Sequence, residues 1–141
     1  MNKCINCGAE LEEAAMVCPK CKAEQPRYVI LLPAEGKTQI VRCTGRCMDQ
    51  AKIERYIGGK AAIDPTVIGG DWAQEEGIDM MMLYNARNAE LPRNQKASSI
   101  STDFDDYTRG NAVLLGFVMA SREHIGIGRS AAAEIVDRWE L

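Results

Sequence analysis

The hydrophobic pattern in the first half of the chain predicts a β-hairpin. Residues 28–32 form an uninterrupted apolar run with two β-branched side chains, and Pro33 stops it. A short glycine-containing turn follows at 34–36, and residues 37–42 then return as a second strand candidate. Two such runs joined by a short turn are typical of paired antiparallel strands. We therefore expect a hairpin over residues 28–42.

Two other segments have helical periodicity. In residues 47–57 the apolar side chains lie on one face of a helix, and Gly58 with Gly59 would end it. In the last segment of the chain, apolar residues again recur at helical spacing. That stripe comprises Ala132, Ile135, Val136 and Trp139. We expect both stripes, including the Trp139 ring, to pack into a core.

The remaining apolar runs complete the predicted fold. Residues 61–63, 80–84 and 111–118 are strand candidates, and the run at 80–84 is apolar throughout, which is typical of a central strand. Residues 64–78 contain glycine and proline around Trp72 and predict irregular backbone. We therefore predict an α+β fold, in which about two helices cover one face of a mostly antiparallel sheet.

The composition agrees with a small folded protein. The chain has 141 residues, of which 46% are hydrophobic and 26% charged, enough for one domain with a small appendage. No apolar stretch approaches the ~20 residues that span a bilayer. The beginning of the sequence lacks the apolar core of a signal peptide. We therefore expect a cytoplasmic protein that does not associate with a membrane.

Four of the six cysteines form two Cys-x-x-Cys pairs with ten residues between them. Two residues between thiolates allow one tight turn to present both sulfurs to one ion at ~2.3 Å. In a reducing compartment such pairs bind metal rather than form disulfides. The pattern predicts one structural Zn²⁺ per chain, because four cysteinates leave no coordination position open for water. The predicted ligands are Cys4, Cys7, Cys18 and Cys21.

Two other uses of paired cysteines fit this sequence less well. A rubredoxin-type iron site encloses its metal in aromatic side chains, whereas no aromatic residue occurs before Tyr28. A redox-active pair opens a helix within a thioredoxin-like unit, and no helical pattern follows either pair. Zinc is therefore the favoured metal.

The two cysteine pairs also resemble a known type of module. The motifs are Cys4-Ile5-Asn6-Cys7-Gly8 and Cys18-Pro19-Lys20-Cys21. They resemble the short double-CxxC zinc ribbons found at the termini of bacterial and viral proteins. The resemblance covers residues 1–26 and implies a zinc ribbon there, followed by an α+β domain at 27–141. A segment of this length cannot build a stable core alone, so zinc would supply its folding energy.

A second resemblance rests on the order of short motifs after the ribbon. These motifs are Pro33 to Gly36, Ile57-Gly58-Gly59, Asn85, Leu91-Pro92-x-Asn94, and Gly110 to Gly116. Over residues 28–118 their order resembles an uncharacterised family of small domains from bacteria, phages and plasmids. Two features depart from that family: Gln95 replaces a basic residue, and the loop at 85–91 is shortened. The resemblance implies a phage or mobile-element accessory protein and brings no named activity.

The other two cysteines allow two interpretations. Cys43 and Cys47 could form half of a second metal site, with His124 as its third ligand. Each cysteine also stands at the predicted boundary of a strand or a helix, where small buried apolar residues are common. We favour burial over metal binding for this pair.

Two segments are candidates for contacts with a partner or ligand. Residues 85–100 predict a long polar loop, a kind of segment that often carries function. A dinucleotide site needs an acidic residue ~20 positions after its glycines, which argues against one in the GxGxxA pattern at 126–131. Amides at this helix start could still bind one phosphate, or Ser130 could simply cap the helix. The candidate binding residues are Asn85, Pro92, Arg93, Asn94, Arg129 and Ser130.

No group in the sequence is poised for catalysis. The predicted zinc site is closed, and the single histidine, His124, has no partner at a characteristic spacing. Asp103, Asp105 and Asp106 cluster locally, which is more typical of a solvated loop than of a magnesium site. We therefore expect a non-enzymatic interaction module.

The charge distribution favours a protein as the partner. The net charge is −3, and the four basic residues among residues 1–27 are balanced by four acidic ones. The best basic footprint comprises Arg42, Arg46, Lys52 and Arg55. Asp49 and Glu54 interrupt it, and affinity for nucleic acid scales with the number of neutralised phosphates. We expect a module that binds and modulates a host macromolecule; the alternatives are a small-ligand or nucleotide-binding protein and a weak nucleic-acid-binding accessory protein.

Overall fold

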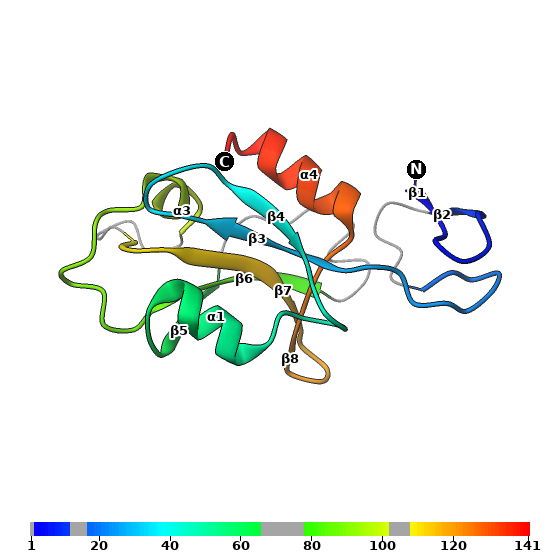
Figure 1. Ribbon diagram of the computed structural model, residues 1–141, viewed down its shortest axis with the longest axis horizontal. Coiled ribbons are helices and arrows are strands. Elements are labelled where there is room, and N and C mark those ends of the chain that lie inside the picture. Colours follow the sequence, from blue (N-terminus) through cyan, green and yellow to red (C-terminus); the bar gives the residue numbers. More distant parts are fainter. Residues whose placement is uncertain (1, 12–16, 66–77, 102–107) are drawn as a thin grey trace.

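The computed structural model describes residues 2–11, 17–65, 78–101 and 108–141 (Figure 1). Most of the irregular segment expected at 64–78, with Trp72, and the acidic cluster at 103–106 lie outside these ranges. Residues 64, 65 and 78 are described and belong to strands, so the expectation of irregular backbone is wrong for them. A small N-terminal unit, which we call the ribbon and which ends at Pro26, lies at one end of the molecule (Figure 1). The remainder, which we call the body, is built on one antiparallel sheet.

Six strands form the sheet of the body among the described residues. They are β3 (Tyr28–Leu32), β4 (Gln39–Arg42), β5 (Ala61–Pro65), β6 (Ile78–Asn85), β7 (Ala112–Val118) and β8 (Glu123–Ile125). Five of them lie in the order β4, β3, β7, β6, β5, and β8 pairs with β7. Ile30 of β3 lies opposite Ile40 of β4 in an antiparallel pair, which confirms the expected hairpin.

β7 connects the two halves of the sheet. β6 pairs with the whole of β7, from Ala112 to Val118. The opposite edge of β7 is shared, because β3 pairs with Ala112–Leu114 and β8 with Gly116–Val118. β6 itself has a neighbour on each edge, as expected for the apolar run at 80–84. β8 was missed in the sequence, because three residues are too few to show a strand pattern.

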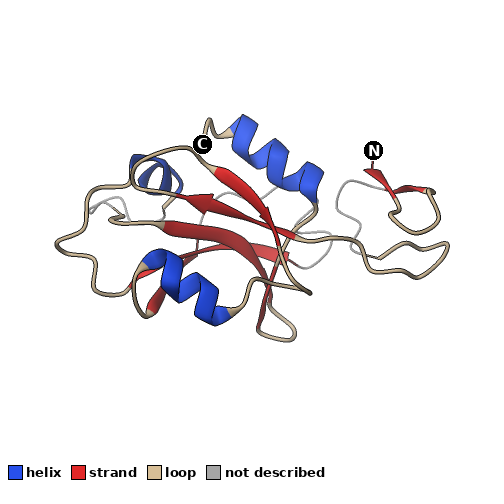
Figure 2. Ribbon diagram, in the orientation of Figure 1, coloured by secondary structure: helices blue, strands red, loops and turns tan. Residues whose placement is uncertain are grey.

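Helices cover both faces of the sheet (Figure 2). They are α1 (Gln50–Ile57), α3 (Gln95–Ile100) and α4 (Arg129–Arg138). α1 packs on the face that carries Val29 and Leu31 of β3. α3 and α4 pack on the opposite face, which carries Ile30 and Leu32. The expectation that the helices share one face is therefore wrong.

The reason for two covered faces lies in the apolar run of β3. Its residues from Val29 to Leu32 are all buried, although successive side chains point to opposite faces of the sheet. A strand that is buried on both faces has a continuous apolar sequence, whereas one with a solvated face alternates. The run at 28–32 therefore already required an element on each side of the sheet.

The helices also differ from expectation at their ends. α1 begins at Gln50 rather than at residue 47, with Asp49 as its N-cap residue. Trp139 stands at the C-cap of α4 and is 39% exposed, so it does not belong to the core. Among the described residues, no helix combines the length and the apolar character that crossing a membrane requires.

Candidate metal centre

The ribbon places its first cysteine pair between two short strands. β1 (Asn2–Lys3) and β2 (Glu10–Leu11) pair antiparallel. The tight turn that carries Cys4 and Cys7, which we call the first knuckle, connects them. Leu11 is buried against Cys4 and Cys18. The core of this unit therefore consists largely of the predicted metal ligands.

The four cysteine sulfurs converge on one point. All four Sγ atoms lie within 4.8 Å of one another. Sγ of Cys4 is 3.5 Å from Sγ of Cys21, and Sγ of Cys7 is 3.7 Å from Sγ of Cys18. A tetrahedron with metal–sulfur bonds of about 2.3 Å has sulfur–sulfur edges of about 3.8 Å. Two of the six sulfur–sulfur distances are thus close to those of a tetrahedral thiolate site, and the other four do not exceed 4.8 Å.

The two Cys-x-x-Cys segments fold into matching knuckles. In the first, the N–H of Gly8 donates to the Cys4 carbonyl (3.0 Å) and the N–H of Cys4 donates to the carbonyl of residue 9 (2.8 Å). In the second, the N–H of Lys22 donates to the Cys18 carbonyl (2.8 Å). Both closing residues are left-handed, with φ of 74° at Gly8 and 66° at Lys22. A lysine in this conformation costs about 1–2 kcal/mol, which metal binding can offset.

Backbone amides point at the sulfurs from inside each knuckle. The N–H groups of Asn6 and Cys7 both lie 3.4 Å from Sγ of Cys4, and the N–H of Cys21 lies 3.5 Å from Sγ of Cys18. These donors stabilise a thiolate over a thiol. The N–H of Cys7 is the largest cause that lowers the pKa of Cys4, to about 6.

Gln25 is a supporting residue that the sequence did not reveal. Its Nε2 donates to Sγ of Cys4 (3.4 Å) and to the carbonyl of Ala23 (3.0 Å), while its Oε1 accepts from the N–H of Ile5 (3.1 Å). One buried amide side chain thus connects both knuckles behind the first ligand. Hydrogen bonds to ligand atoms orient them and adjust their charge, which is why such residues influence metal affinity.

The donor set and its geometry fit a metal ion with a preference for thiolates. Four cysteine sulfurs that converge on one point match the structural sites of zinc proteins. Cys4, Cys7, Cys18 and Cys21 would hold the ion, and within the described part of the chain no side chain of another type belongs to the cluster. Such a coordination sphere is complete, so the metal would organise the ribbon.

Cys43, Cys47 and His124 do not join in a second cluster. Among the described residues, the four cysteines of the ribbon are the only such group of metal-binding side chains. Cys43 is buried, and burial raises the pKa of its thiol to about 11. The ring of His124 lies 5.3 Å from that of Phe117, and burial lowers the pKa of the imidazole. These residues are accounted for by packing, which is the interpretation that the sequence favoured.

Asn94 and Asn85, which the sequence suggested as partner contacts, are committed to the interior. Asn94 is 0% exposed. Its Nδ2 donates to the carbonyls of Leu32 (2.7 Å) and Gly110 (2.9 Å), and its Oδ1 accepts from the N–H of Ala97 (3.0 Å) as the N-cap of α3. Asn85 is also buried. Neither side chain is available at the surface, and the second part of the expected loop at 85–100 is helix α3.

Asn85 fixes the end of α1. Its Nδ2 donates to the carbonyl of Ile57 (3.2 Å), and its Oδ1 accepts from the N–H of Arg87 (2.9 Å). The side chain therefore connects the C-terminus of α1 to the end of β6. These two hydrogen bonds explain why Asn85 is buried, and no partner protein is needed to account for it.

The remaining candidates are exposed or partly exposed and fall into two separate pairs. Pro92 and Arg93 are exposed in the loop before α3, whereas Arg129 is exposed and Ser130 half-buried at the start of α4. The loop and the start of α4 lie towards opposite ends of the body (Figure 1). The N-cap of α4 is Gly128, which has no side chain to cap the helix, so the expected cap at Ser130 is not formed.

Comparison with known proteins finds no match among protein-family models, curated proteins or solved structures. The resemblance of residues 28–118 to small bacterial, phage and plasmid domains therefore stays a prediction. The metal centre is supported by the geometry of the chain itself.

Proposed function

We propose that this chain is a non-enzymatic interaction module, in which a structural zinc ion folds the ribbon and the ribbon contacts a partner protein. The cluster of four cysteine sulfurs within 4.8 Å of one another carries this proposal. Four thiolates complete the coordination of zinc, so the ion stabilises the fold and offers no open position to a substrate.

Two apolar side chains next to the ligands support recognition of a protein. Ile5, within the first knuckle, is 63% exposed, and Val17, directly before Cys18, is 42% exposed. Complete burial of such a side chain stabilises a complex by about 1.5–3 kcal/mol. The ribbon thus presents apolar surface that its own small core does not use.

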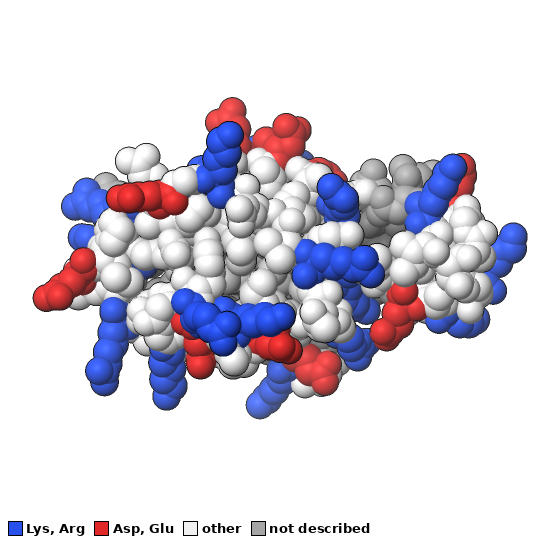
Figure 3. All heavy atoms as spheres, viewed as in Figure 1, with Lys and Arg blue, Asp and Glu red and all other residues white. Residues whose placement is uncertain are grey.

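The charge pattern also fits a protein partner better than nucleic acid. Basic and acidic side chains are interspersed over the face shown in Figure 3, without one continuous basic stripe on that face. Arg46, part of the best basic footprint, lies 3.8 Å from a carboxylate oxygen of Glu24 and 4.0 Å from one of Glu123. Mixed charge of this kind limits the number of phosphates that can be neutralised.

Native mass spectrometry of the purified chain tests the metal. We expect one zinc ion per chain, lost from a Cys7→Ser variant and retained by Cys47→Ser, whose thiol lies in the body. Iron, or a chain that carries no metal at all, would contradict the proposal.

Affinity capture from the native host tests recognition. Ile5→Ser and Val17→Ser should each weaken capture, whereas Ile63→Ser should not, although Ile63 in β5 is 53% exposed. All three residues are exposed, so the substitutions should leave the fold intact. If the three variants capture the same proteins as the wild type in equal amounts, the ribbon is not the recognition surface.

A further inference from the structure

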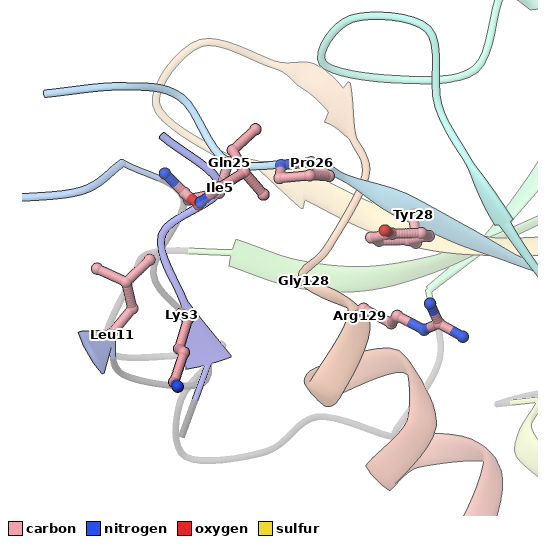
Figure 4. Close-up of a pocket in the computed structure, with 8 residues that line it drawn as sticks. All are labelled: Lys3, Ile5, Leu11, Gln25, Pro26, Tyr28, Gly128 and Arg129. Atoms are coloured by element: carbon pink, nitrogen blue, oxygen red, sulfur yellow. The ribbon is translucent and has the colours of Figure 1, made fainter. Parts of the chain in front are cut away.

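We propose that a pocket between the ribbon and the start of α4 binds an acidic segment of the partner protein, with one apolar side chain in the pocket and carboxylates on both sides of it. This inference rests on the proposed function and names the chemistry of its partner. The pocket has a volume of about 140 Å³ and is lined from both parts of the molecule (Figure 4).

Four apolar or aromatic side chains line the pocket. Ile5 and Leu11 line it from the ribbon, and Pro26 and Tyr28 line it from the segment that enters β3. An apolar cavity of about 150 Å³ can hold a benzene molecule, so this pocket has room for one branched or aromatic side chain. The exposure of Ile5 leaves the pocket accessible from solvent.

Two basic side chains also line the pocket. Lys3 and Arg129 are exposed and are the charged side chains that line it; no carboxylate among the described residues does so. Figure 4 shows the two cations on opposite sides of Gly128. Arg129 also lies over the ring of Tyr28, with its guanidinium carbon 6.0 Å from the ring centroid.

The start of α4 adds to this positive potential. The first turn of α4 contains no acidic residue, and Gly128 as N-cap has no side chain to accept from the helix amides. The N-terminal end of a helix dipole favours negative charge. The dipole alone would not define a site, but it has the same sign as the two side chains beside the pocket.

This arrangement suits an extended acidic segment better than a single small anion. A single phosphate could use the positive charge of Lys3 and Arg129 but would leave the apolar side chains that line the pocket without a partner. A peptide with an apolar residue between acidic residues matches all three features at once. Complementary charge of this kind increases both the specificity and the association rate of complexes.

The pocket depends on the metal because two residues of its ribbon wall contact the cysteines that would hold the ion. Leu11 packs against Cys4 and Cys18, and Gln25, which also lines the pocket, donates to Sγ of Cys4. Loss of the metal would disorder these contacts and remove the wall that the ribbon supplies. We therefore expect peptide binding to require zinc.

Selection from a library of random heptapeptides against the zinc-loaded full chain tests the proposal. The expected consensus is one apolar residue with acidic residues on both sides. The selected peptide, synthesised with blocked ends, should bind in calorimetric titration and should shift the amide resonances of Lys3, Gly128 and Arg129. No enrichment, or a neutral or basic consensus, would overturn the proposal.

Charge reversal at the two ends of α4 provides a matched comparison. Arg129→Glu should weaken the peptide about tenfold or more, while Arg138→Glu, at the other end of the same helix, should change its affinity less than about twofold. A glutamate in the first turn is favourable for a helix, so Arg129→Glu should not fail to fold. Equal effects of the two variants would place the peptide elsewhere and overturn the pocket assignment.

The outcome separates this inference from the proposed function. If the wild type captures a host protein and Arg129→Glu captures it equally well, the interaction module stands and the pocket assignment fails. If the peptide binds through Arg129 but no host protein depends on the ribbon, the pocket stands and the proposed function fails.

Discussion

Buried side-chain amides hold the irregular parts of this chain in place. Asn94 joins β3, the segment before β7 and the start of α3, and Gln25 joins the two knuckles of the ribbon. Position in the sequence gives no indication of such burial, so Asn94 was expected at a surface. One signal was present: an asparagine directly before four residues without proline or glycine is a common N-cap.

Replacing Asn94 with alanine should be among the most destabilising single changes in the body. The carbonyls of Leu32 and Gly110 would lose their donor while buried, and α3 would lose its cap. Unsatisfied buried acceptors and a lost cap together cost about 3 kcal/mol or more. Urea denaturation would measure the loss. Pro92→Ala, two positions earlier but exposed, should lower the free energy of unfolding by no more than about 1 kcal/mol, mainly because the unfolded chain gains conformational freedom.

His124 should make stability depend on pH. Burial lowers the pKa of the folded imidazole, and no partner binds its buried Nε2 among the described residues. As the pH falls through about 6.5, the unfolded chain takes up a proton before the folded chain does. The contribution of neutral His124 is therefore fully present above that pH and decreases as the pH approaches the lower folded value.

The comparison with His124→Phe isolates this effect. His124 is the single histidine of the chain, and phenylalanine keeps a ring beside Phe117. Denaturation midpoints from about pH 7 to about pH 5.5 should fall less steeply for the variant than for the wild type. Parallel profiles would show that the histidine does not titrate differently in the two states.

At the scale of elements, the long apolar runs were predictable and the short elements were not. The hairpin of β3 and β4, the strand β6 and the strand β7 each arise from runs that have few other stable arrangements. β8 has three residues and α3 has six, too few for a periodic pattern, and both depend on contacts with distant segments. The position of β8 is set by its pairing with β7, and the start of α3 is set by the Asn94 cap.

Gly126, the first glycine of the GxGxxA pattern at 126–131, is required for close packing rather than for ligand binding. A Cβ atom at this position would lie 2.8 Å from Cβ of Arg27 and 2.8 Å from Sγ of Cys43. Gly126→Ala should therefore destabilise the body by about 1–3 kcal/mol, because β3 and the segment before α4 would have to separate. Thermal denaturation would detect the change.

A double substitution tests the cause of that loss. Cys43→Ala removes one of the two crowded atoms, so the loss in Gly126→Ala should be smaller in the Cys43→Ala background. Strict additivity of the two effects would show that crowding against the thiol does not contribute.

At the scale of the whole molecule, the cysteine cluster was predictable and the residues that support it were not. The spacing of the two Cys-x-x-Cys pairs predicts that the four sulfurs meet, and they do. Gln25 and the pocket beside Tyr28 depend on how the ribbon meets the body, which no local pattern encodes. The covering of both faces of the sheet is an intermediate case, because the apolar run of β3 indicates it but does not identify which helix covers which face.

Loss of one ligand should unfold the ribbon and leave the body folded. The ribbon core of Cys4, Leu11 and Cys18 is separate from the two clusters that flank the sheet. In Cys7→Ser, amide resonances of the ribbon should therefore collapse to unfolded positions, while those of β3, β6 and β7 stay dispersed. Cys47→Ser should keep both sets dispersed. Loss of cooperative unfolding of the body in Cys7→Ser would show that the two parts fold as one.

The pairing of β3 with β7 also determines the order in which the chain can fold during synthesis. Ile30 lies opposite Leu114, so β3 leaves the ribosome long before its central partner exists. At about 5–20 residues per second, the apolar edge of the β3–β4 hairpin waits roughly 4–16 s for β7. The four clustered cysteines all precede β3, so under the proposed function the ribbon can bind its ion during that interval. Nascent chains should thus carry a folded, metal-bound ribbon while the edge of β3 that pairs with β7 is still unpaired. That edge is where a chaperone would be needed.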